Sequence, residues 1–138
     1  MFKQIVVALD GSEQSLRAAE KAIGLAKVSG AYVYVVYAVD GTTSKSDVLS
    51  TWNSLGVTEK RKKKFKYVEQ CAKKEGVSYE MKIVRGEPAI SIVHFAQSVE
   101  ADLIVIGSRG LNQFQQMVLG SVSHKVVKRA TCPVLIIK

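Results

Sequence analysis

Hydrophobic residues gather in five short runs that alternate with four longer segments of mixed polarity. The runs lie at 3–9, 31–38, 78–84, 103–107 and 133–138. Within them, IVVAL at 5–9 and LIVI at 103–106 are apolar at consecutive positions, as in a strand with both faces covered. The pattern therefore predicts five strands of a parallel sheet that is buried between helices.

The intervening segments follow the helical repeat of about 3.6 residues. They predict helices at 13–29, 58–75, 88–99 and 120–130. Pro88 suits the first position of the third helix, and Gly30 suits the end of the first. Each helix needs an inward face, for which the sequence offers Leu16, Ala19, Ile23, Ala26, Phe65, Val68, Ala72, Ile90, Val93, Ala96, Val122, Val126 and Ala130.

Strict alternation of strands and helices implies right-handed crossovers and a three-layer α/β sandwich. A chain of 138 residues suits one core, and no repeat or linker divides it, so we expect 1–138 to be a single domain. The irregular stretch 40–57 is rich in Ser, Thr and Gly, as in loops that act as lids or are partly disordered. Trp52 either anchors this loop or stays exposed within it.

Composition limits the class of protein. No apolar run approaches the roughly 18 residues of a membrane helix, and the chain opens directly with a strand, without the regions of a signal peptide. We therefore expect a cytoplasmic protein that does not enter a membrane. Cys71 and Cys132 are too few for a four-cysteine zinc site, and we expect both to be small buried residues.

The formal net charge of +8 is concentrated in one segment. Residues 58–76 (TEKRKKKFKYVEQCAKKEG) contain eight Lys or Arg against three Glu. This helix either presents a solvated basic face or engages an acidic partner. It lacks the interleaved aromatic residues that stack on bases, so we do not expect a nucleic-acid partner.

The clearest chemical signal follows the fourth apolar run. Residues 103–123 read LIVIGSRGLNQFQQMVLGSVS, with Gly107, Gly110, Gly120 and Ser121 in the spacing G-x-x-G-x9-G-S. Glycines let backbone N–H groups approach a ligand, and a hydroxyl residue at a helix start adds a donor. These are the parts of a ribose and phosphate site, although the spacing is neither a P-loop nor a dinucleotide fingerprint.

A second candidate turn, Ala8-Leu9-Asp10-Gly11-Ser12, ends the first run. If the first strand is central, the winding of the sheet reverses between it and the fourth strand, where open sheets bind ligands. Asp10 would then offer a carboxylate to a sugar hydroxyl or a divalent cation. Alternatively, it caps the first helix together with Ser12.

Five pieces of the chain match a known pattern in their order and spacing. They are IVVALDGSEQS near the start, the turn at 85–88 (RGEP), ADLIVIGSRG at 101–110, GSVSHKVVKRA at 120–130 and CPVLIIK at the end. On these pieces the chain resembles the universal stress protein family, in its ATP-binding class. The resemblance implies an adenine nucleotide alpha hydrolase-like fold, with four main helices and an open five-stranded parallel sheet in the order 3-2-1-4-5.

The resemblance also implies a nucleotide site. The turn at 107–110 would face ribose and phosphate, residues 120–123 would present donors to the phosphates, and the end of the second strand would contact adenine through its backbone. Arg109 either adds a cation near the phosphates or points to solvent, and Asp10 is the candidate ligand for Mg or Mn bound with the nucleotide. The implied site comprises Ala8, Asp10, Ala38, Val39, Gly107, Ser108, Arg109, Gly110, Gly120, Ser121, Val122 and Ser123.

Three functions stay open at this point. The first is a cytosolic stress-response regulator that binds ATP or AMP. The second is a slow ATPase, for which the chain offers no catalytic base and no Lys or Arg between Leu111 and Leu119. The third is an interaction module with a vestigial site, acting through its basic helix. The terminal strand 133–138 is expected at a sheet edge, and the resemblance implies that it pairs with a second copy to form a homodimer.

Overall fold

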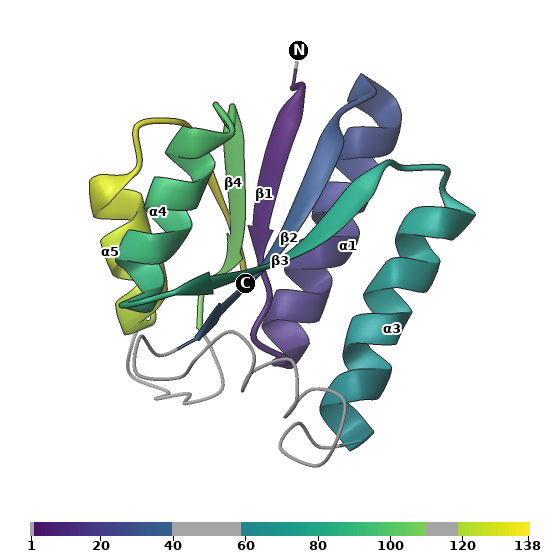
Figure 1. Cartoon of the computed structure of the whole chain (residues 1–138), viewed down its shortest axis with the longest axis horizontal. Helices are drawn as coiled ribbons and strands as arrows, with labels where there is room; N and C mark the ends of the chain where they lie inside the picture. Colours follow the sequence, from purple (N-terminus) through teal and green to yellow (C-terminus); the bar gives the residue numbers. More distant parts are fainter. Residues whose placement is uncertain (1, 40–58, 110–118) are drawn as a thin grey trace.

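The part of the chain that the structure describes forms one sheet of five parallel strands, with four helices on its two faces (Figure 1). This computed structural model describes residues 2–39, 59–109 and 119–138, and for Val39 and residues 59–62 it describes the backbone alone. The elements are β1 (Gln4–Ala8), α1 (Glu13–Ser29), β2 (Tyr32–Val39), α3 (Glu59–Lys74), β3 (Tyr79–Arg85), α4 (Pro88–Ser98), β4 (Leu103–Gly107), α5 (Ser121–Arg129) and β5 (Val134–Ile137). All the predicted strands and helices are present, and their ends shift by at most one residue. The predicted loop 40–57, with Trp52, lies outside the described residues.

The strand order is β3-β2-β1-β4-β5, and every neighbouring pair is parallel. This confirms the predicted α/β fold. β1 lies between β2 and β4, with Ala8 opposite Val36 on one side and Val7 opposite Val105 on the other. The winding therefore reverses between β1 and β4, and their carboxyl ends form the switch point of the sheet.

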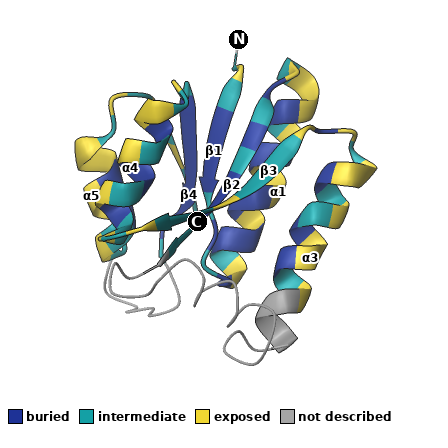
Figure 2. Ribbon diagram, in the orientation of Figure 1, coloured by how far each residue is buried: buried dark blue, intermediate teal, exposed yellow. Residues whose placement is uncertain are grey.

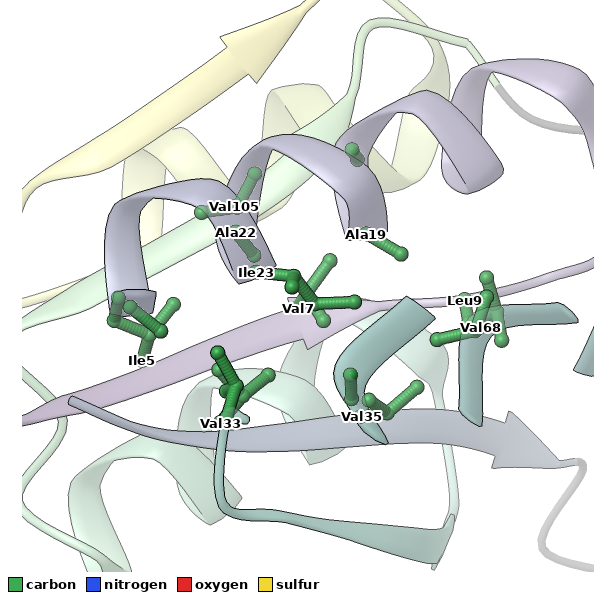
Figure 3. Packing of buried hydrophobic residues seen from close by; sticks show 14 of the residues in the cluster. Ile5, Val7, Leu9, Ala19, Ala22, Ile23, Val33, Val35, Val68 and Val105 are labelled. Atoms are coloured by element: carbon green, nitrogen blue, oxygen red, sulfur yellow. The ribbon is translucent and has the colours of Figure 1, made fainter. Parts of the chain in front are cut away.

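Alternate side chains of each strand point to opposite faces and divide the core in two. Figure 2 shows that the ribbon is buried along most of β1 and β4, the inner part of the sheet. Ile5 and Val7 pack with α1 and α3, as Figure 3 shows for Ile23 and Val68. Val6 packs with α4 and α5 on the other face. This double cover explains why β1 and β4 are apolar at every core position.

The buried face of α4 differs from the predicted one. Ala89, Ile92, Val93 and Ala96 are buried, whereas Ile90 is 36% exposed. The four buried residues follow the i, i+3, i+4, i+7 pattern of one helical face, from which Ile90 is displaced by about 100°. The prediction for Ile90 is therefore wrong, because the buried face of α4 includes its neighbour Ala89 instead.

Four other residues that were expected inside are only half-buried. Val122 borders the cavity described below, and Ala130 and Cys132 border a smaller hollow of about 150 Å³. Cys71 packs at the margin of the α1 and α3 core, and both thiols are free. Each of these side chains therefore lies at the edge of a core.

Local signals fix the helix ends. Pro88 opens α4, as predicted, and Gly30 ends α1 in the left-handed conformation with φ of 75°.

No described helix has both the length and the apolar character needed to cross a membrane.

Candidate functional site

A cavity of about 300 Å³ opens at the carboxyl ends of β1, β2 and β4, beside the switch point of the sheet. Small-molecule sites usually measure about 300–1,000 Å³, so its volume suits a small organic ligand. Its wall combines residues from β1 and the following turn, β2, α4, the end of β4 and the start of α5. Segments far apart in the sequence thus meet at one place.

Most residues of the predicted site line this cavity. Ser108 is buried behind the wall, Val39 is described by its backbone alone, and Gly110 lies outside the described residues. The predicted residues found in the wall are Ala8, Asp10, Ala38, Gly107, Arg109, Gly120, Ser121, Val122 and Ser123.

Six further wall residues were not predicted. Val36 lies two positions before Ala38 on the same face of β2, and Ile106 directly precedes Gly107. Pro88 and Ile92 are one helical turn apart on α4, a spacing that could have marked them as neighbours. The remaining two are Ser15 and Leu9, and Leu9 belongs to the candidate turn at 8–12 although not to the implied set of site residues.

The turn after β1 is held by a short network of hydrogen bonds. Asp10 Oδ1 accepts a bond of 2.8 Å from the Ser12 N–H, and the Asp10 N–H donates to Ser15 Oγ at 3.3 Å. Ser12 is the N-cap of α1 and accepts from the Ser15 N–H at 3.1 Å. Asp10 therefore supports the N-cap residue of α1 and also lines the cavity, whereas its contact with a sugar hydroxyl or a cation stays a prediction.

The basic helix α3 contributes one lysine to this turn. Lys64 Nζ donates to the Gly11 carbonyl at 2.8 Å and forms an ion pair with Glu13 at 3.3 Å. Its side chain is 19% exposed, whereas the neighbouring Lys63 belongs to the exposed residues. The basic face of α3 is therefore not wholly solvated, since Lys64 connects α3 to the turn that carries Asp10.

The backbone of Ser108 joins the end of β4 to the start of α5. Its carbonyl accepts from the Gly120 N–H at 2.6 Å and from Ser123 Oγ at 2.8 Å. A hydroxyl has one proton to donate, so the Ser123 hydroxyl supports the loop in this arrangement. The exposed Ser121 makes no hydrogen bond through its side chain to any described residue, and its hydroxyl is a candidate donor to a ligand.

Positive charge gathers on the α5 side of the cavity. Gly120 is the N-cap of α5 without a side-chain cap, so the N–H groups of the first turn lack helical partners. Arg109 is half-buried in the wall, and its Nε is buried without a hydrogen-bond partner among the described residues. A buried guanidinium N–H without a partner in the described part of the chain and a helix N-terminus both favour an anion.

The sheet order defines a doubly wound α/β protein, and its cavity lies at the switch point where such proteins bind ligands. The model of the Universal stress protein family matches residues 1–138, and the chain belongs to this family. It is 38% identical over 141 residues to universal stress protein MJ0531 of Methanocaldococcus jannaschii, covering 100% of this chain and 83% of that protein.

Solved structures of similar proteins agree with the fold. A universal stress protein from Archaeoglobus fulgidus in complex with dAMP is 31% identical, covers 100% of this chain and 98% of its own, and has a TM-score of 0.72. A universal stress protein in complex with cAMP is 29% identical, with coverage of 99% and 97% and a TM-score of 0.72. Relatives with the same fold therefore hold adenine nucleotides.

Proposed function

We propose that this chain binds an adenine nucleotide, ATP or AMP, in the cavity at the switch point and acts as a nucleotide-dependent stress-response regulator in the cytoplasm. The observation that carries the proposal is the division of the cavity wall. Val36, Ala38 and Ile92 supply apolar surface from β2 and α4, whereas Arg109 and the start of α5 supply positive charge. A nucleotide has the same division, with an apolar base at one end and an anionic phosphate at the other. The complexes of two relatives with dAMP and cAMP support adenine as the base.

In this proposal the phosphates meet Arg109, the Ser121 hydroxyl and the first N–H groups of α5, where an anion gains both hydrogen bonds and the helix dipole. The base lies toward β2 and α4. Asp10, on the turn after β1, accepts from a ribose hydroxyl or contacts a cation.

A divalent cation would arrive with the nucleotide. Among the described residues no three His, Cys, Asp or Glu side chains cluster in a way that could hold a metal. Asp10 uses Oδ1 for the Ser12 N–H, which leaves its second oxygen for a ligand. Mg²⁺ commonly binds through one or two carboxylates, phosphate oxygens and water, and Asp10 suits that role for Mg or Mn.

Calorimetry on the purified protein tests the proposal. We expect saturable binding of ATP with Mg²⁺ and of AMP. GTP should bind at least about tenfold more weakly, because guanine has two polar exocyclic groups to desolvate against the apolar wall where adenine has one. Analysis of nucleotide released from protein purified without added ligand identifies which one it carries. No binding of any adenine nucleotide at millimolar concentration would overturn the proposal.

We also propose that β5 pairs with β5 of a second copy to form a homodimer. In the described sheet β5 is an edge strand, with β4 as its neighbour. The Pro133 carbonyl accepts from Ile104 of β4, and the Ile137 carbonyl accepts from Ser108, directly after β4. The alternate residues Val134 and Ile136 therefore direct their backbone groups to the open edge. An uncovered edge of this kind is a template for strand pairing.

Replacing Ile136 with proline should separate such a dimer, because it removes an N–H at the open edge and leaves the bonds to β4 in place. Light scattering should give twice the chain mass of 15.1 kDa for the wild type and for the control Ile136→Ala, which keeps the N–H. The Ile136→Pro variant should give the monomer mass. A monomeric wild type, or a dimeric proline variant, would count against pairing through β5.

A further inference from the structure

Gln14, in the first turn of α1, contacts the end of β4. Its Oε1 accepts from the backbone N–H of Arg109 at 2.6 Å and from the Ser108 hydroxyl at 3.2 Å. A Cβ added to Gly107 would lie 3.1 Å from the Gln14 Cβ and 3.3 Å from the Gln14 backbone carbon. The start of α1 therefore packs directly on the backbone that leads from β4 to Arg109.

The same short backbone is held from its other side by α5. On the α5 side, the Ser108 carbonyl accepts from the Gly120 N–H and from the Ser123 hydroxyl. On the α1 side, Gln14 accepts from the Ser108 hydroxyl and from the backbone N–H of Arg109. Ser108 and Arg109 are thus fixed between two helices. The direction in which the Arg109 side chain leaves the backbone depends on both attachments.

We propose that Gln14 is a positioning residue for phosphate recognition, acting through Arg109. Gln14 does not line the cavity, and it would touch no ligand. Its role is to accept a hydrogen bond from the backbone N–H of Arg109 and so to fix the backbone from which the Arg109 side chain reaches the cavity wall. The inference rests on the proposed nucleotide binding and adds a residue of α1 to the recognition of the phosphates.

The chemistry of the side chain gives two informative replacements. An amide oxygen has two lone pairs and can accept both donors at once. Methionine has nearly the same length but only a weakly accepting sulfur, so Gln14→Met leaves the Arg109 N–H without a good partner. Glutamate keeps two acceptor oxygens at the same distance from the backbone, so Gln14→Glu should retain the contact with Arg109. Gln70, exposed on α3, provides a matched control as Gln70→Met.

The first measurement is amide hydrogen exchange at Arg109 in the protein without ligand. Exchange should be slow in the wild type and in Gln14→Glu, faster in Gln14→Met, and unchanged in Gln70→Met, because only Gln14→Met removes the acceptor. Unchanged exchange in Gln14→Met would overturn the contact itself, whether or not the protein binds nucleotide.

The second measurement is calorimetry with ATP and adenosine on the same variants. We expect Gln14→Met to weaken ATP binding about tenfold, the effect of losing roughly one well-placed hydrogen bond, and to leave adenosine within about twofold. An equal loss for ATP and adenosine indicates general damage to the cavity and would overturn the inference, as would unchanged ATP affinity. Failure of the wild type to bind any adenine nucleotide is a separate result that rejects the proposed function.

Discussion

Alanine at Gly107 is expected to weaken ATP binding at least about tenfold and to lower the free energy of unfolding by about 1–3 kcal/mol, the usual cost of overpacking. The added Cβ would lie 3.1 Å from the Gln14 Cβ and 3.3 Å from both the Gln14 backbone carbon and the Arg109 carbonyl oxygen. None of these atoms is the free end of a flexible side chain. Relief therefore requires α1 and the end of β4 to separate, which disturbs the hydrogen bonds that orient Arg109. Urea unfolding and calorimetry measure the two effects.

Gly24 provides the control for this substitution. It is exposed within α1, and a Cβ there meets nothing within 4 Å. Gly24→Ala should therefore raise the free energy of unfolding by about 0.5–1 kcal/mol through helix propensity and leave ATP affinity unchanged. A Gly107→Ala variant that matched Gly24→Ala in both measurements would show that the close packing at the end of β4 has no consequence.

Two glycines of the G-x-x-G-x9-G-S motif, Gly107 and Gly120, have a physical role in packing that was not inferred from the sequence. The sequence indicates glycine because backbone N–H groups must approach a ligand. In the structure, Gly107 also makes room for Gln14, and a Cβ at Gly120 would lie 3.3 Å from the Arg109 Cα. Both positions therefore allow helices α1 and α5 to pack closely on the backbone of Ser108 and Arg109.

The fold could be predicted from the sequence because its signals are periodic and local. Runs such as LIVI, buried on both faces in β4, indicate a strand covered by helices, and Gly30 and Pro88 mark helix ends through their own backbone preferences. The prediction for Ile90 was wrong because the helical repeat fixes the spacing of buried residues but not which neighbouring position is buried, and the fully buried residue here is the small Ala89.

The residues that line the cavity were predicted only where they belong to the glycine motif or to the end of a strand. Residues such as Asp10 and Gly120 follow from the rule that parallel strands bring their carboxyl ends to one edge. Gln14 and Lys64 act across elements, through side chains that reach another helix or turn. No spacing in the sequence encodes such contacts, because they depend on how closely the packed elements approach.

Replacing Arg109 with methionine is expected to give the largest selective loss of nucleotide affinity. A charge-assisted hydrogen bond contributes about 1.5–3 kcal/mol, so ATP binding should weaken roughly 10- to 150-fold, AMP binding less, and adenosine binding very little. The free energy of unfolding should not fall, because Arg109 Nε has no partner among the described residues that the substitution would leave unpaired. Calorimetry with the three ligands and urea unfolding measure these effects.

Arg129 separates the local effect of Arg109 from that of the net charge. It is exposed in the last turn of α5, at the opposite end of that helix from Gly120, and Arg129→Met removes the same charge. If Arg109 acts through contact with phosphate, Arg129→Met should change ATP affinity by less than about twofold, since an exposed charge beyond the Debye length is largely screened at physiological salt. Equal losses in the two variants would mean that the protein attracts nucleotide through its overall charge of +8, and Arg109 would then have no specific role.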